Sequence, residues 1–86
     1  MAYNVFYKGS VQRDLKKLSK VEARRILDQI EEELSRNAEA YPTLKGIFAG
    51  LRKYRVGDYR VIYALLGNAV LVLRIGHRKD VYKQKI

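Results

Sequence analysis

The sequence predicts an α+β fold with the element order β-α-α-β-β-β, in which an antiparallel sheet carries a helical hairpin on one face. Two observations support this prediction. Apolar residues at helical spacing follow one short strand in the first half of the chain, whereas strand-forming runs alternate with glycine turns in the second half. A chain of 86 residues supplies one hydrophobic core, so residues 1–86 are expected to form a single domain.

The first strand is predicted over residues 2–7, because Tyr3, Val5 and Tyr7 share one face of an extended chain. Ser10 is expected to cap the helix that follows. The apolar stripe of that helix consists of Val11, Leu15 and Leu18. This stripe has to be buried against another element, which predicts a position on the sheet.

A second helix is predicted from Lys20 to about Arg36. Ser19 is its expected N-cap, and Glu22 three residues later completes a capping box. The inner side of this helix carries Ile26, Leu27, Ile30 and Leu34. Because so short a turn separates the two helices, they are expected to pair as an αα-hairpin.

Residues 37–50 are expected to form a loop. Its apolar residues Leu44, Ile47 and Phe48 are the expected anchors on the domain. Three strands are then predicted: Leu51–Val56, Tyr59–Leu66 and Ala69–Ile75. The last is almost wholly apolar, which predicts a central strand buried on both faces, while the first strand of the chain is expected at one edge of the sheet.

The formal net charge of the chain is +9, and residues 43–86 carry +8 of it. A charge concentrated in one half predicts a polyanionic partner. The chain has no cysteine and one histidine, and it lacks both a phosphate-binding loop and a nucleophile-elbow serine. These absences argue against metalloprotease, nucleotide hydrolase and serine hydrolase chemistry. No metal or cofactor is expected, and with no membrane span or secretion signal the expected location is cytoplasmic.

Cations and one tyrosine are the candidate functional residues. Lys53 and Arg55 are two residues apart on one strand, so they leave the same face. Arg60 follows across a tight turn, and Arg78 and Tyr82 follow the last strand. Together they are expected to line a groove on the sheet face that the helices leave open.

Such a groove suits cleavage of RNA by its own 2′-hydroxyl. Arginines neutralise the phosphate charge that grows as the 2′-oxygen attacks phosphorus. A lysine, or a tyrosine near cations, would accept the 2′ proton if its neighbours lowered its pKa. The structural alternatives are ordinary solvent-facing charges at Lys53 and Arg55, an edge position for Arg74, and a structural hydrogen bond for His77.

Two stretches resemble a known family. Residues 51–63, LRKYRVGDYRVIY, resemble the hallmark of the RelE/ParE toxin superfamily, and residues 75–82, IGHRKDVY, resemble the C-terminal signature of its RelE branch. The resemblance implies a toxin of a type II toxin–antitoxin system. It further implies a ribosome-dependent endoribonuclease that cuts mRNA in the A site without a metal.

The same resemblance implies roles for individual residues. Arg60 matches the arginine that contacts the scissile phosphate, and Arg78 matches the arginine that stabilises the transition state and leaving group. Tyr82 matches a tyrosine that stacks on or positions the substrate, and Lys53 and Arg55 match a basic pair. Further RNA contacts are expected from Lys45, Arg52, Arg74, His77, Lys79 and Lys83.

The implied partners are the ribosome with its mRNA, and a RelB-like antitoxin that wraps the toxin, neutralises the groove and binds operator DNA as part of the complex. Two other functions share this fold or this charge. One is a ParE-like toxin that poisons DNA gyrase without nuclease activity. The other is an RNA-binding module that has no catalytic activity.

Overall fold

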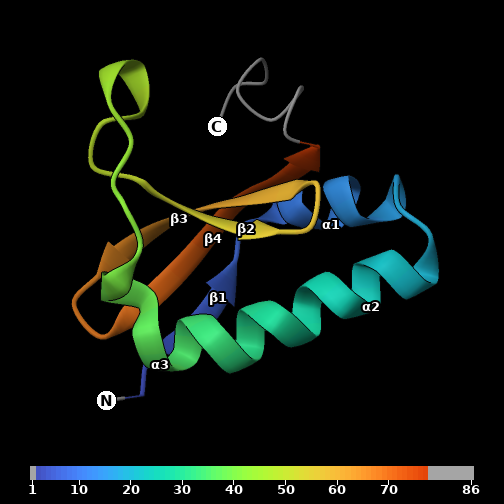
Figure 1. The fold of residues 1–86 in the computed structure, drawn as a ribbon, viewed down its shortest axis with the longest axis horizontal. Coiled ribbons are helices and arrows are strands. Elements are labelled where there is room, and N and C mark those ends of the chain that lie inside the picture. The colour runs from blue at the N-terminus through green and yellow to red at the C-terminus, as the bar shows by residue number, and fades with distance from the viewer. Residues whose placement is uncertain (1, 78–86) are drawn as a thin grey trace.

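The computed structural model describes residues 2–77 and confirms the predicted α+β class, with a helical layer on one face of a four-stranded sheet (Figure 1). The helices are α1 (Gly9–Lys16), α2 (Lys20–Gln29) and α3 (Ser35–Asn37). The strands are β1 (Asn4–Tyr7), β2 (Arg52–Val56), β3 (Tyr59–Leu66) and β4 (Ala69–His77). Among the described residues, no helix has the length and apolar character needed to cross a bilayer.

The sheet has the order β1-β4-β3-β2, so β1 lies at an edge as predicted. It pairs with β4 in parallel, however, which makes the sheet mixed where a wholly antiparallel one was expected. The cause is the helical layer, which returns the chain so that β2 starts at the same end of the sheet as β1. Because β2, β3 and β4 then form an antiparallel meander, β4 runs in the direction of β1.

The start of α1 differs from the sequence prediction. The last strand-like hydrogen bond joins Lys8 N to Val72 O (2.9 Å), and the helix begins at the next residue with Lys8 as N-cap. Ser10 therefore lies inside α1, and its hydroxyl donates to Leu73 O instead (2.8 Å). The start of α2 is as predicted, because Ser19 Oγ accepts a hydrogen bond from Glu22 N (3.1 Å).

One turn of π-helix, Ile30–Leu34, connects α2 to α3. The core residues of this segment recur every fourth position, and all four are fully buried: Ile26, Ile30, Leu34 and Ala38. In a regular α-helix a four-residue spacing rotates the stripe by about 40° at each step. The wider π turn returns the stripe to the sheet, so the helix stays packed along its length.

Tyrosine hydroxyls tie the sheet to this helical segment. Tyr63 is fully buried and donates to Ala38 O (2.6 Å), and Tyr54 donates to Gln29 Oε1 (3.1 Å). Burial raises the pKa of Tyr63 to about 12, because ionisation would leave a charge in the core. These two hydrogen bonds fix the position of the helical segment along the sheet, which apolar packing alone does not specify.

A β-bulge in β4 decides which residues face which side. Ile62 pairs with Arg74 and Tyr63 pairs with Val72, so Leu73 is an extra residue with no partner on β3. After the bulge the alternation shifts by one residue. Ile75 therefore packs in the core, and Arg74 lies on the sheet face opposite the helices, where the strand is only half-buried rather than fully buried as predicted.

Candidate functional site

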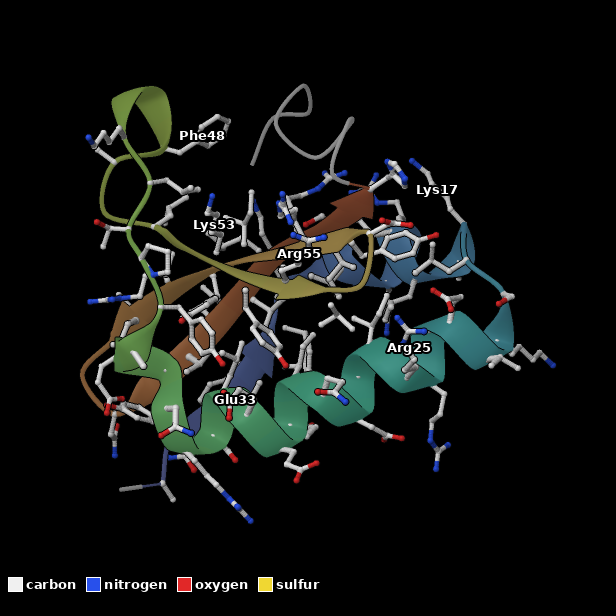
Figure 2. All side chains as sticks on the ribbon, in the orientation of Figure 1. Lys17, Arg25, Glu33, Phe48, Lys53 and Arg55 are labelled. Carbon is white, nitrogen blue, oxygen red and sulfur yellow. The ribbon has the colours of Figure 1, made fainter. Side chains whose placement is uncertain are left out.

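The sheet face opposite the helices carries three cations on neighbouring strands. Lys53 and Arg55 extend from β2, and Arg60 on β3 stands directly opposite Arg55 in the strand register. Figure 2 shows Lys53 and Arg55 on the side of the sheet away from α2, which carries Arg25, and away from the π-helical turn that carries Glu33. We call Lys53, Arg55 and Arg60 the cationic strip. Three of the five residues predicted to line a groove thus lie on one face of the sheet.

The cationic strip has no compensating acid within residues 2–77: the ion pairs of this region involve other residues. Like charges directly opposite on two strands destabilise a sheet. Arg55 and Arg60 therefore cost folding free energy that an anionic ligand lying between them would recover.

Arg60 has an additional unsatisfied donor. Its Nε is buried and has no hydrogen-bond partner in the described part of the chain. The Arg60 side chain also lines a shallow pocket of about 270 Å³, together with Tyr41, Pro42, Lys53, Tyr54 and Arg55. Because a buried donor without an acceptor is unfavourable, this pocket favours a ligand that brings an acceptor oxygen.

Arg55 is partly fixed before any ligand arrives. Its Nε donates to Gly57 O in the β2–β3 turn (3.0 Å), which holds the guanidinium against that turn. Gly57 has a φ of 58°, and a Cβ built there would lie 2.5 Å from Arg25 Nη2 of α2. The turn that positions Arg55 thus requires glycine for its backbone conformation.

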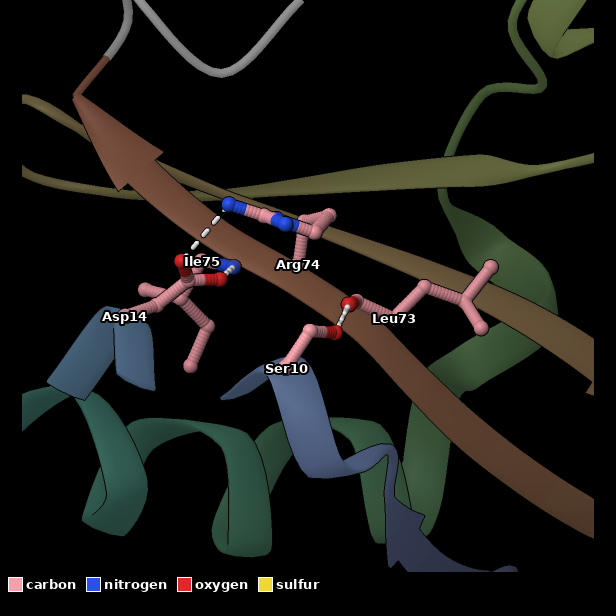
Figure 3. A network of polar contacts seen from close by, with 5 residues as sticks. All are labelled: Ser10, Asp14, Leu73, Arg74 and Ile75. Atoms are coloured by element: carbon pink, nitrogen blue, oxygen red, sulfur yellow. Dashed lines mark hydrogen bonds and ion pairs between the residues drawn. The ribbon is translucent and has the colours of Figure 1, made fainter. Parts of the chain in front are cut away.

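Arg74, a predicted RNA contact, lies on the same face but is neutralised. Its Nη2 lies 2.8 Å from Asp14 Oδ1 on α1, and the two side chains are 15% and 3% exposed. Asp14 Oδ2 also accepts from Ile75 N (2.9 Å), and Ser10 bonds Leu73 O beside it (Figure 3). With β1 ending at Tyr7, α1 thus occupies the edge of β4 and satisfies its backbone groups.

Two other predicted RNA contacts face the helical side. Arg52 Nη1 donates to Tyr41 O (2.6 Å) and Glu39 O (3.2 Å), so it fastens the loop to β2. His77 pairs with Tyr59 on the helix side of the sheet, with ring centroids 5.9 Å apart. The structure therefore does not bring Arg52 and His77 to the cationic strip. Lys45 is exposed in the loop before β2.

The remaining predicted site residues, Arg78, Lys79, Tyr82 and Lys83, lie outside the described residues. Within the described residues, no three His, Asp or Glu side chains are grouped to hold a metal ion. Asp14 was missed from the sequence, although a signal existed: it stands on the apolar stripe of α1, between Val11 and Leu15. A carboxylate on a buried stripe predicts a buried partner, which Arg74 in an apolar strand supplies.

A family model described as the ParE toxin of the type II toxin–antitoxin system parDE matches residues 5–82. This chain belongs to the RelE/ParE toxin superfamily. It is therefore the toxin of a type II toxin–antitoxin system, and the cationic strip is part of its open sheet face.

Solved structures agree with this membership. The toxin–antitoxin complex RelBE2 from Mycobacterium tuberculosis has 28% identity and a TM-score of 0.83, covering 91% of this chain and 100% of that one. The archaeal RelE–RelB complex from Pyrococcus horikoshii OT3 has 32% identity and a TM-score of 0.64, covering 91% and 97%. A chromosomal ParDE system from P. aeruginosa, with 14% identity, a TM-score of 0.70 and coverage of 88% and 96%, shares the fold. A search among curated proteins gave no match.

Proposed function

We propose that this toxin is an endoribonuclease that cuts mRNA in the ribosomal A site, without a metal, and so inhibits translation. One observation carries the proposal: three cations lie on one sheet face without a carboxylate partner in the described residues, and the buried Nε of Arg60 lacks an acceptor. A phosphodiester supplies both the negative charge and the acceptor oxygens that this surface lacks.

The reaction needs no nucleophile from the protein. The 2′-oxygen of the RNA attacks the adjacent phosphorus, the bond from phosphorus to the 5′-oxygen breaks, and a 2′,3′-cyclic phosphate remains. The 2′-hydroxyl proton leaves to a base, and the departing 5′-oxygen gains a proton. In this mechanism Arg60 binds the scissile phosphate, while Lys53 and Arg55 neutralise the charge that develops on its oxygens.

The last part of the chain completes the proposed site. Arg78 would stabilise the transition state and the leaving oxygen, and Tyr82 would stack on or position the substrate. Both roles rest on the resemblance of residues 75–82 to the RelE signature. Lys45, Lys79 and Lys83 are proposed to bind RNA phosphates around this centre.

A RelB-like antitoxin is the proposed protein partner. The Mycobacterium and Pyrococcus structures are both complexes of such a toxin with an antitoxin. An antitoxin with acidic side chains would neutralise the cationic strip, and the complex would bind operator DNA. A toxin that cuts mRNA on the ribosome would act in the cytoplasm.

Primer extension on a translated message tests the proposal. Arg60→Ala is expected to lower the rate of mRNA cleavage by about 100-fold or more, since removal of one transition-state donor costs that much in other enzymes. Arg36→Ala is the matched control, because Arg36 is an exposed arginine of α3 on the helical layer. Equal cleavage by a folded Arg60→Ala variant and the control would contradict the proposed site.

A gyrase-poisoning toxin is the second candidate, because the family model that matches this chain carries the ParE description. Gyrase-dependent DNA cleavage is measured in parallel with mRNA cleavage. DNA breakage without mRNA cleavage would favour the second candidate. RNA binding with neither activity would indicate a non-catalytic binding module.

A further inference from the structure

The loop before β2 is held against the edge of that strand, next to the cationic strip. Lys53 N donates to Pro42 O (3.3 Å), and Thr43 forms an antiparallel bridge with Arg52. Tyr41 and Pro42 therefore stand beside β2, where both line the shallow pocket that they share with the cationic strip. The lining of this pocket thus combines ring side chains with all three cations of the strip.

Tyr41 is fixed in place before any ligand arrives. Its hydroxyl donates to Glu33 Oε2 in the π-helical turn, and its ring lies against that of Tyr54 with centroids 4.9 Å apart. Its backbone carbonyl accepts from Arg52 Nη1 (2.6 Å). Burial raises the pKa of Tyr41, so the hydroxyl stays protonated and keeps its hydrogen bond to the carboxylate. A ligand that binds against this ring therefore meets a surface that needs no ordering.

The loop side of the pocket offers ring surface more than hydrogen-bonding groups. The hydroxyl and carbonyl of Tyr41 and the carbonyl of Pro42 already have the partners named above, and proline has no N–H. Such a surface suits the face of a planar group rather than its polar edge. The pocket volume of about 270 Å³ lies just below the roughly 300–1,000 Å³ of sites that hold drug-sized ligands, so it suits one small ring system.

We infer that this pocket binds one nucleobase of the RNA whose phosphate lies on the cationic strip, and that the base stacks on Tyr41. The inference rests on the proposed function and extends it to how the substrate is held. A nucleotide has an anionic phosphate and a planar base, and here cations and a fixed ring lie side by side for them. Stacking uses the face of the base, so the contact selects an unpaired base over a paired one and discriminates little among the four bases.

Binding of short oligonucleotides tests the inference. The probes are fluorescein-labelled trinucleotides with 2′-O-methyl riboses, which are not cut because the attacking 2′-oxygen is blocked. One probe carries all three bases, and three others each lack the base at one position. Anisotropy of the dye measures the affinity of each probe.

Three variants are compared with the wild type. Tyr41→Ala removes the ring, whereas Tyr41→Phe removes only the hydroxyl. Tyr3→Ala is the matched control, because Tyr3 is another half-buried tyrosine whose hydroxyl bonds a glutamate, Glu39 (2.6 Å), and it lies directly before β1 at the opposite edge of the sheet. Thermal unfolding of each variant verifies that it is folded.

In the wild type, loss of the base at one of the three positions is expected to weaken binding about tenfold through this contact. Tyr41→Ala is expected to abolish that difference and to leave the effects of the other two positions unchanged, because only the base in the pocket touches the ring. Tyr41→Phe and Tyr3→Ala are expected to retain it. Since the difference compares two probes on the same protein, a partial loss of folded protein does not change it.

Other outcomes overturn the inference in distinguishable ways. If each missing base has the same effect in the wild type and in a folded Tyr41→Ala variant, no base stacks on Tyr41, and the proposed nuclease function stays intact. Equal weakening of all four probes by Tyr41→Ala would mean that the ring only supports the shape of the cationic strip. Absence of binding of every probe to the wild type at low salt would also overturn the inference, while primer extension with Arg60→Ala decides the proposed function separately.

Discussion

Replacing Asp14 with alanine tests the contact between α1 and the sheet edge most directly. The carboxylate is 3% exposed and has two partners, Arg74 Nη2 at 2.8 Å and Ile75 N at 2.9 Å. Its removal breaks the ion pair of a nearly buried guanidinium and takes the acceptor away from a buried N–H. Loss of one member of a buried ion pair costs about 3–5 kcal/mol.

That loss is large against the total stability of a small domain, which is about 5–15 kcal/mol. In a domain of this size each kcal/mol lowers the melting temperature by about 4–8 °C, so Asp14→Ala is expected to lower it by at least about 12 °C. Urea and thermal unfolding followed by circular dichroism measure both quantities. The result should not depend on salt as strongly as an exposed pair does.

Two further variants isolate the cause. Asp28→Ala removes an aspartate from the exposed pair Arg24–Asp28, whose side chains are 82% and 70% exposed, and is expected to cost less than about 1 kcal/mol. Asp14→Ala combined with Arg74→Met removes the buried charge as well and is expected to be more stable than Asp14→Ala alone. A loss in Asp14→Ala no greater than that in Asp28→Ala would refute the reasoning.

Two more predictions concern stability. Burial raises the pKa of Tyr63 to about 12 from an ordinary value near 10, so its stabilising effect is complete below pH 10 and is lost as pH rises toward 12. The free energy of unfolding should therefore change less between pH 9 and pH 11 in Tyr63→Phe than in the wild type. Gly57→Ala is expected to cost about 1–2 kcal/mol in urea unfolding because φ is 58° there. Arg25→Ala added to it should restore little, because the flexible Arg25 side chain moves aside; full rescue would show that the steric contact dominates.

Local patterns predicted the elements well because they depend on neighbouring residues. The glycine turns located the hairpin strands, and two-residue alternation placed Lys53 and Arg55 on one face. The capping role of Ser19 was also predictable, since it needs only a backbone N–H three residues ahead. The capping role predicted for Ser10 was wrong, because its hydroxyl donates instead to a carbonyl 63 positions away, that of Leu73.

Features that depend on distant partners were not predictable in this way. The β-bulge at Leu73 adds no distinctive residue to the sequence, yet it sets the side on which Arg74 and His77 lie. Simple alternation would place Arg74 in the core and His77 on the open face, the reverse of what the strand pairing gives. The parallel pairing of β1 likewise depends on the path of the helices, which no local pattern records.

The uneven distribution of charge between residues 20–40 and the opposite sheet face gives the molecule an electric dipole. Residues 20–40 of the helical layer carry six acidic and four basic side chains, whereas the opposite sheet face carries the cationic strip. In the field of a polyanion such a dipole experiences a torque that turns the sheet toward the negative surface and the helices away from it. The toxin is thereby oriented before it touches the polyanion. Raising the ionic strength should slow their association, because salt screens the field that orients the toxin.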